Sequence, residues 1–252
     1  MKKIKAGLWG FGRTGSVVAK ELFNDKNFEL QWIVRKTKTD KKQYASHSFG
    51  YEYDAVPIFG EQEVNADFFE QNEVDIIIDF SNFDGYKSYE AAAERGIRII
   101  SAISEYREED LYQLKKYSEK TAVLYSPNIT IGINFLLIAS QVFQKIVPYA
   151  DIEIVEEHFR EKKEISGTAL KIAKVLGLKS ERINSVRVGG IVGRHEIIFG
   201  LQNQTVRLTH ESINKAAFGR GAIFAAKWLI HKTRGFYSME EIITEMIVKE
   251  LV

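Results

Sequence analysis

Short apolar runs alternate with longer amphipathic stretches along the first half of the chain. The runs expected to form buried strands are 5–9, 28–34, 74–80, 97–102 and 122–125. The stretches with helical length and spacing lie between them, at 16–23, 85–95 and 107–120. This alternation predicts an α/β, Rossmann-type domain built on a doubly wound parallel sheet. Its ligand crevice is expected at the C-terminal ends of the strands.

The pattern changes after residue 128. Helices are expected up to about residue 147 and over 166–176. The further runs expected to form strands are 152–158, 185–192, 196–201 and 205–210. A run of strands after a βαβ half predicts a second, smaller α+β domain with a mixed sheet. The tail is expected to be helical at 219–228 and 239–251.

The first expected strand leads directly into Gly10-Phe11-Gly12-Arg13-Thr14-Gly15, and a helix follows. In this context G-x-G-x-x-G is typical of a dinucleotide site. The first glycine permits a tight turn, the second lets the backbone approach a pyrophosphate, and the third brings the helix close to the strand. We therefore predict that residues 10–15 bind a dinucleotide cofactor. The alternative is a plain structural turn.

Other strand ends should face the same crevice. The residues predicted there to contribute to the cofactor site are Phe80, Ser81, Ser101, Ala102, Ser126 and Asn128. At the end of the second strand, Arg35 and Lys36 stand where an acidic residue would bind the adenosine ribose, and the next acidic residue is Asp40. Basic residues there accommodate a 2′-phosphate, so we predict a preference for NADP(H), with NAD(H) possible. The alternative is a solvated basic turn.

Composition narrows the class of protein. The chain has 252 residues, 45% of them hydrophobic, and a formal net charge of +1, so we expect neither nucleic acid nor a membrane surface as a partner. No stretch reaches the roughly 18 uninterrupted apolar residues of a membrane span. The sequence has no cysteine, which excludes disulfides, thiolate metal sites and cysteine nucleophiles. These features, with no apparent signal peptide, predict a cytoplasmic protein.

A candidate acid–base site follows the expected strand at 152–158. In an extended segment His158, Arg160 and Lys162 would share one face, which places a proton donor beside two cations. The cations would lower the pKa of the histidine and Glu156 would raise it, so the direction stays open. Ser166, Gly167 and Thr168 open the next helix and offer hydroxyl and amide donors for a substrate carboxylate.

Structural interpretations compete with these roles. The alternatives are that residues 161–164 form only a solvated charged loop, that Ser166 is a helix N-cap and that His158 is structural. We interpret His195 and His210 as structural, and His47 and His231 as surface residues. No spacing of acidic residues and histidines indicates a metal site.

Several motifs together resemble the dihydrodipicolinate reductase family over nearly the whole chain. They are GFGRTG at 10–15, IDFS at 78–81, SPNITIGIN at 126–134, EIVEEHFREK at 153–162, SGTA at 166–169, GIVGRH at 190–195, and segments at 218–222 and 235–237. The resemblance implies a dinucleotide-binding domain of 1–127 with 219–252, and a domain of 128–218 for substrate binding and oligomerisation. It also implies a homotetramer that reduces a cyclic imine or enamine dicarboxylate with NAD(P)H in lysine and diaminopimelate biosynthesis.

Within this resemblance His158 matches the proposed general acid and Lys162 the lysine near the substrate. Ser166, Gly167 and Thr168 match the segment that binds a substrate carboxylate. The chain also departs from the family pattern. Phe159 replaces a second histidine, the Asp-Ala-Pro stretch before Ser166 is missing, residues 101–104 replace a Gly-Thr-Thr-Gly loop, and the connection 176–185 is short.

Three hypotheses follow. The first is an NADPH-preferring reductase of this family, and the second is a paralogue that acts on another amino or imino acid, such as a diamino acid dehydrogenase. The third is a non-catalytic protein that binds NADP(H). Phe159 and the missing stretch motivate the second, whereas His158 and Lys162 at the family spacing argue against the third.

Overall fold

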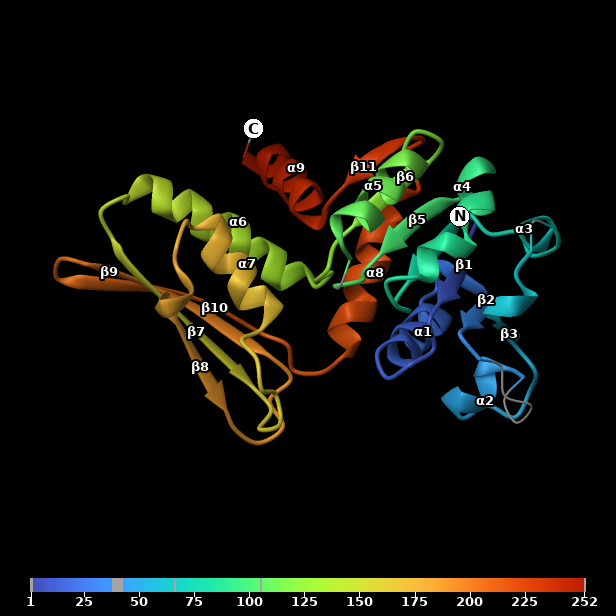
Figure 1. Ribbon diagram of the computed structural model, residues 1–252, viewed down its shortest axis with the longest axis horizontal. Helices are drawn as coiled ribbons and strands as arrows, with labels where there is room; N and C mark the ends of the chain where they lie inside the picture. Colours follow the sequence, from blue (N-terminus) through green and yellow to red (C-terminus); the bar gives the residue numbers. More distant parts are fainter. Residues whose placement is uncertain (1, 38–42, 66, 105, 252) are drawn as a thin grey trace. The chain divides into compact units, whose positions relative to one another are not determined.

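The computed structural model describes residues 2–37, 43–65, 67–104 and 106–251 (Figure 1). Asp40, noted above, lies outside the described residues. The chain divides into two compact units. Unit 1 is Met1–Ile129 with Phe218–Ile242, and unit 2 is Thr130–Ala217 with Ile243–Val252. Among the described residues, no helix combines the length and the apolar character needed to cross a bilayer.

Unit 1 is built on one seven-stranded sheet in which every neighbouring pair is parallel. Its strands, in spatial order, are β11 (Gly235–Tyr237), β6 (Ala122–Tyr125), β5 (Arg98–Ser101), β4 (Ile76–Asp79), β1 (Ile4–Trp9), β2 (Phe28–Arg35) and β3 (Ile58–Gly60). The order reverses between β1 and β4, where a doubly wound sheet forms its ligand crevice. The predicted fold class is therefore confirmed.

The central strands of unit 1 are continuous apolar runs because both faces of the sheet are covered. Ile76, Ile77 and Ile78 of β4 are fully buried. The α-helices of this unit are α1 (Gly15–Asn24), α2 (Ala45–Phe49), α3 (Phe68–Gln71), α4 (Glu90–Glu94), α5 (Glu108–Tyr117) and α8 (Ala216–Leu229), together with the start of α9 (Met239–Leu251). The helix expected at 85–95 forms in two pieces, η2 (Gly85–Ser88) and α4, and a further short helix, η1 (Glu61–Glu63), follows β3.

Unit 2 is a four-stranded mixed sheet with helices α6 (Ile131–Ile146) and α7 (Gly167–Val175) on one face (Figure 1). Its strands, in spatial order, are β10 (Gln204–Glu211), β9 (Arg194–Leu201), β7 (Asp151–His158) and β8 (Ile183–Arg187), with η3 (Ser180–Arg182) before β8. β7 pairs antiparallel with β9 and parallel with β8. Strand alternation turns Ile152 and Ile154 towards the helices, and Ile197 and Phe199 of β9 are buried with them.

The structure differs from the sequence expectations in three places. β8 spans Ile183–Arg187 instead of 185–192, because the chain turns at Gly189, whose φ is +55°, and Val188 donates its backbone N–H to the carbonyl of His158. The three-residue strand β11 was not predicted from the hydrophobic pattern, since a run of this length has no measurable period. We expected all of 219–252 in the first domain. Helix α9 begins in unit 1, but residues 243–252 group with unit 2.

Candidate active site

The turn between β1 and α1 has the geometry of a dinucleotide-binding loop. Gly10 has φ +95°, and a Cβ there would lie 2.6 Å from the Phe80 carbonyl carbon and the Ser81 nitrogen. A Cβ on Gly15 would lie 2.2 Å from the Gly10 carbonyl oxygen, so both positions require glycine. Gly12, in contrast, has no atom of the described residues within 4 Å of its would-be Cβ, apart from its own chain neighbours. This open space lets a pyrophosphate approach the backbone, so the loop fits the predicted cofactor.

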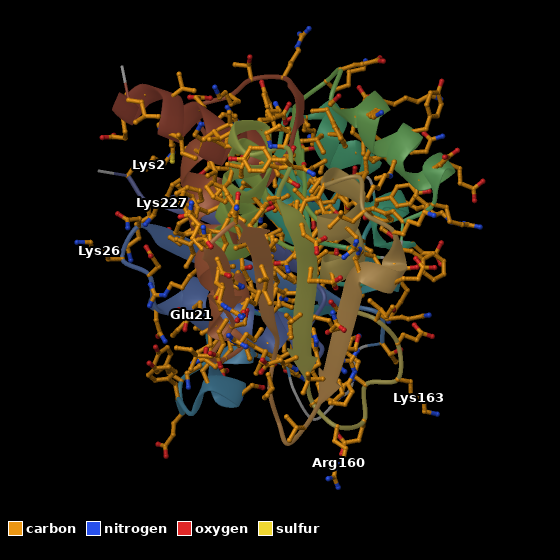
Figure 2. All side chains as sticks on the ribbon, turned by 90° about the vertical axis from the view of Figure 1, so that its left-hand side faces the viewer. Lys2, Glu21, Lys26, Arg160, Lys163 and Lys227 are labelled. Atoms are coloured by element: carbon orange, nitrogen blue, oxygen red, sulfur yellow. The ribbon has the colours of Figure 1, made fainter. Side chains whose placement is uncertain are left out.

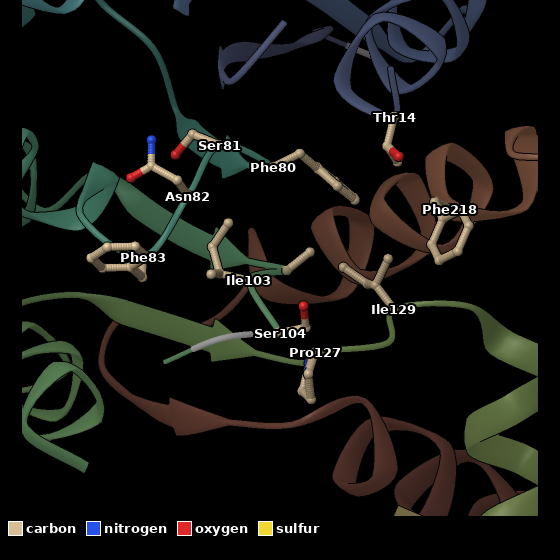
Figure 3. Close-up of a pocket in the computed structure, with 11 residues that line it drawn as sticks. Thr14, Phe80, Ser81, Asn82, Phe83, Ile103, Ser104, Pro127, Ile129 and Phe218 are labelled. Atoms are coloured by element: carbon tan, nitrogen blue, oxygen red, sulfur yellow. The ribbon is translucent and has the colours of Figure 1, made fainter. Parts of the chain in front are cut away.

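Two pockets of about 280 and 300 Å³ adjoin this loop, and Phe80, Ser81 and Asn82 line both. The first also contains Gly10, Phe11 and Gly12 of the loop, and Arg35, Lys36 and Thr37 after β2. The second extends past the ends of β5 and β6. Figure 3 shows the Phe80, Ile103 and Ile129 side chains directed towards one another in it. Two adjoining pockets, of which only the first has basic side chains among its described lining residues, suit the two ends of a nicotinamide dinucleotide.

The structure brings most of the predicted cofactor residues to these two pockets. Those that line one of them are Gly10, Phe11, Gly12, Thr14, Arg35, Lys36, Phe80, Ser81 and Ala102. Those that line neither are Arg13, Gly15, Ser101, Ser126 and Asn128. Ser101 and Ser126 are fully buried, and their hydroxyls bond to Tyr106 and to the Asn128 carbonyl. These two serines therefore support the loops and do not line the crevice. The sequence pattern cannot distinguish the two roles.

Sequence reasoning missed several lining residues. They are Thr37, Asn82, Phe83, Ile103, Ser104, Pro127, Ile129 and Phe218. Most of them stand one to three positions beyond a predicted strand end, so a wider window after each strand would have found them. Phe218 lies far away in sequence, and its only signal was the motif at 218–222 that contributes to the family resemblance.

A second polar cluster lies at the end of β7 in unit 2. Glu156 and His158 continue the inward-facing row of Ile152 and Ile154, so they are turned towards the covered face of the sheet. Strand register supplies their neighbours: Glu156 is opposite Ser185 on β8 and opposite His195 on β9. His158 is opposite Arg187. Pairing of three strands thus assembles the cluster from residues far apart in sequence.

The Glu156 carboxylate is the centre of this cluster and is fully buried. It accepts hydrogen bonds from Arg187 Nη2 and Ser185 Oγ, both at 2.5 Å, and bonds to Nδ1 of His158. Burial alone would raise the pKa of Glu156. The bonds from Arg187 and Ser185 and the neighbouring His158 outweigh it and hold this pKa below its usual value. Glu156 is therefore a carboxylate that fixes His158 through Nδ1 and leaves Nε2 for a ligand.

The pKa of His158 is lowered, which answers the question that the sequence left open. Burial is the largest cause, and the positive charges of Lys162 and Arg187 add to it, while Glu156 opposes it. On the far side of the ring, a Cβ on Gly193 would lie 3.1 Å from Nε2. A glycine at 193 therefore leaves space beside the free nitrogen.

His195 joins this cluster, although we interpreted it as structural from the sequence. Its ring lies 5.3 Å from that of His158, and its Nε2 lies 3.0 Å from Ser166 Oγ. Burial, and secondarily His158, lower the pKa of His195 to about 3, so it is neutral. Ser166 is the N-cap of α7, as its sequence also allowed, and accepts the backbone N–H of Ala169. The signal for His195 was the alternation of β9, but the register that brings it to Glu156 cannot be read from one strand.

The prediction that His158, Arg160 and Lys162 share one strand face was wrong. β7 ends at His158, and the chain then turns: Arg160 N–H bonds to Gly189 O and Lys162 N–H to Phe159 O. Arg160 is exposed, and Figure 2 shows it and Lys163 projecting away from the ribbon. Lys162 still acts electrostatically on His158. Gly167 and Thr168 lie in the first turn of α7, next to Ser166.

Glu156, His158 and His195 also offer metal-ligating atoms within 4.8 Å of one another. The sequence spacing gave no sign of this group, because strand pairing creates it. The carboxylate is already engaged by Arg187, Ser185 and His158, and a guanidinium beside it repels a further cation. The arrangement is therefore suited to proton transfer more than to metal binding.

Family models match nearly the whole chain. The model described as dihydrodipicolinate reductase, N-terminus, matches residues 4–129, and the one described as dihydrodipicolinate reductase, C-terminus, matches residues 129–243. The chain belongs to the dihydrodipicolinate reductase family. The resemblance stated from the sequence is thereby confirmed. The two models meet at residue 129, where unit 1 gives way to unit 2.

Individual relatives agree with this family. A 4-hydroxy-tetrahydrodipicolinate reductase of Caldanaerobacter subterraneus subsp. tengcongensis is 31% identical, over 92% of this chain and 94% of that protein. A dipicolinate-bound dihydrodipicolinate reductase from Paenisporosarcina sp. TG-14 shares the fold, with a TM-score of 0.77 at 22% identity over 95% of this chain and 99% of that one. A DAP dehydrogenase of C. glutamicum has a TM-score of 0.56 at 10% identity, over 96% of this chain and 94% of that one. That likeness concerns the fold alone and adds nothing for the diamino acid dehydrogenase alternative.

Proposed function

We propose that this protein is a 4-hydroxy-tetrahydrodipicolinate reductase that uses NADPH in preference to NADH. Unit 1 binds the cofactor, and unit 2 binds the cyclic dicarboxylate. The observation that carries the proposal is the Glu156–His158 pair, an oriented imidazole in a member of a reductase family. The family reduces an imine or enamine, and that reaction needs a proton donor beside the substrate.

The cofactor preference rests on the turn after β2. Arg35 and Lys36 line the same pocket as Gly10 and Gly12, and no acidic side chain is among the residues of that pocket that the structure describes. A guanidinium and an ammonium favour a 2′-phosphate, whereas a carboxylate would favour the free ribose hydroxyl. NADH remains a usable second cofactor, since the glycine loop binds the pyrophosphate of both.

The proton is delivered by His158. A bound nicotinamide cofactor supplies the hydride. Glu156 holds Nδ1, so the imidazolium presents its Nε2 proton on the side of Gly193. The lowered pKa of His158 makes the imidazolium a strong proton donor. A dianionic substrate bound beside it would raise this pKa and so favour the protonated form. Lys162 contributes positive charge near the substrate.

The substrate carboxylates are held by the start of α7. Ser166 offers its hydroxyl, and the first-turn amides at Gly167 and Thr168 lie at the positive end of the helix. The side chain of Arg160, which the sequence places near the substrate, is exposed and points away from the ribbon, so the carboxylates are bound without it (Figure 2). Phe159, 42% exposed, places an apolar ring where the family usually has a second histidine.

The test is NADPH oxidation, followed by absorbance, with the unstable substrate generated in a coupled dihydrodipicolinate synthase reaction. Rapid turnover is expected. The protein should in parallel be screened for NADP⁺ reduction over amino acids, including diaminopimelate. Turnover only in that screen would move the function to the paralogue, and NADPH binding without turnover in either would identify a non-catalytic binding protein.

We also propose a cytoplasmic homotetramer. Support for self-association comes from unit 2, whose sheet has helices on one face only and ends in the edge strand β10. On that open face Arg194 pairs with Glu157 and Glu196, and Arg207 pairs with Glu196, so the surface is polar but internally neutralised. The cysteine-free composition supports the cytoplasm. Light scattering coupled to size exclusion tests the tetramer, and a monomeric mass would contradict it.

A further inference from the structure

A buried carboxylate lies beneath the cofactor loop and has no role in the chemistry described so far. Asp79 is the last residue of β4 and is fully buried. Its Oδ1 accepts two hydrogen bonds from Ser81, from the backbone N–H at 2.8 Å and from Oγ at 2.6 Å. Its Oδ2 accepts the Tyr89 hydroxyl at 3.0 Å. A buried carboxylate with three donors is costly to assemble, so its position calls for an explanation.

The bonds from Asp79 determine the course of the chain at the junction of the two pockets. Phe80, Ser81 and Asn82 are the residues common to both pockets. The Phe80–Ser81 peptide is also the surface against which Gly10 packs, as the 2.6 Å approach of its would-be Cβ shows. The Asp79 carboxylate thus holds the peptide on which the pyrophosphate loop rests.

The same network reaches the end of the next strand. Tyr106 acts electrostatically on Tyr89, and the Tyr106 hydroxyl lies 2.9 Å from Ser101 Oγ at the end of β5. The Asp79 carbonyl accepts the N–H of Ala102, which lines the second pocket. Polar bonds therefore connect the crevice ends of β4 and β5 below the pocket floor.

We propose that Asp79 is a positioning residue of the cofactor site, which holds the Phe80–Asn82 segment, and through Tyr89 and Tyr106 the end of β5, in the shape that binds the dinucleotide. The inference rests on cofactor binding and not on the identity of the substrate. Burial raises the pKa of Asp79 to about 6, with a small further contribution from Glu61, so above pH 7 the carboxylate form accepts all three bonds.

The chain offers a matched control for this network. Tyr86 also donates its hydroxyl to a buried carboxylate, Asp110, at 2.9 Å. Tyr86 and Tyr89 belong to the same apolar cluster, but neither Tyr86 nor Asp110 lines either cofactor pocket. Tyr89→Phe and Tyr86→Phe therefore remove equivalent bonds, and only the first removes a bond to Asp79. Both variants keep the aromatic ring, so the contact of the Tyr86 ring with Tyr106 is preserved.

The experiment measures the NADPH Kd by fluorescence titration, together with the thermal midpoint of each variant. We expect Tyr89→Phe to raise the Kd about threefold to tenfold and Tyr86→Phe to leave it unchanged, with similar losses of thermal midpoint. Asp79→Ala should raise the Kd more than tenfold, and Asp79→Asn should restore most of the affinity, since an amide can accept from Ser81 and donate to Tyr89.

Two results would overturn the inference. One is an unchanged NADPH Kd in Tyr89→Phe. This result can be obtained even if Asp79→Ala does not fold. The other is an equal rise of the NADPH Kd in Tyr89→Phe and Tyr86→Phe, which would show that the rise comes from a general loss of stability. Because NADPH binding is read without substrate, failure of the proposed reductase activity would leave this test intact.

Discussion

At the residue scale, burial determines how the pKa of His158 responds to the charges around it. The sequence places Glu156 two positions from His158, and a carboxylate there is expected to raise the histidine pKa. The structure buries His158 and adds Arg187 from β8, and the pKa is lowered. Because Arg187 neutralises the Glu156 carboxylate, Glu156 orients the His158 imidazole but does little to favour its protonated form.

His195 is predicted to set the hydrogen-bonding state of Ser166. Ser166 Oγ already accepts the N–H of Ala169, so if it also accepts Nε2–H of neutral His195, its own proton is free for a substrate carboxylate. His195→Phe should therefore raise the substrate KM about tenfold, while the KM for NADPH is unchanged. His195→Gln, which keeps an N–H donor, should lose less. Steady-state kinetics on both variants decide this, and an unchanged substrate KM in His195→Phe would refute it.

Asp79 should make stability depend on pH. Its pKa is raised from 3.8 to about 6 in the folded protein, so the native state binds more protons than the unfolded chain between these values. The contribution of Asp79 to the free energy of unfolding is then complete below pH 4 and declines as the pH rises to about 6. The decline is on the order of 3 kcal/mol.

Urea unfolding of the wild type and of Asp79→Asn across pH 4 to 7 measures this contribution. The difference between the two proteins should shift in favour of Asp79→Asn as the pH rises, because the variant has no charge to bury. A difference that stays constant over the whole range would show that Asp79 does not titrate there.

At the element scale, the cofactor half of the protein was predictable and the polar cluster around Glu156 was not. A parallel sheet carries its ligand at the ends of its strands, so local patterns such as GFGRTG and IDFS locate the pockets directly. The cluster around Glu156 depends on which residues of β8 and β9 lie opposite β7. Register is a property of three strands together, and the end of β8 was itself predicted five residues too late.

The turn after β2 gives the sharpest test of cofactor preference. Reversing the charges with Arg35→Glu and Lys36→Glu should raise the NADPH Kd about 10- to 100-fold and change the NADH Kd little, because only NADPH carries the 2′-phosphate. Lys2→Glu with Lys26→Glu is the matched control, since it makes the same change of net charge on exposed residues that line neither pocket. Fluorescence titration with both cofactors measures the ratio. An equal loss for NADPH and NADH would show that this turn does not contact the phosphate.

At the scale of the whole molecule, two compact units divide the proposed chemistry. Unit 1 contains the glycine loop and both cofactor pockets, and unit 2 contains His158 with its supporting carboxylate. The division predicts that changes in the unit 2 cluster leave cofactor binding intact. It also explains why the family could be recognised from the sequence although the catalytic geometry could not: the motifs are local, while the cluster is assembled within a folded sheet.

The central claim is that His158 protonates the substrate after hydride transfer. The most direct test compares initial rates of NADPH oxidation by the wild type and His158→Gln, with substrate supplied by a coupled synthase and the NADPH Kd measured alongside. We predict rapid turnover by the wild type, a loss of about 10²- to 10⁴-fold in the variant, and the same Kd in both. Equal rates for the two proteins would contradict the role of His158 and the account built on it.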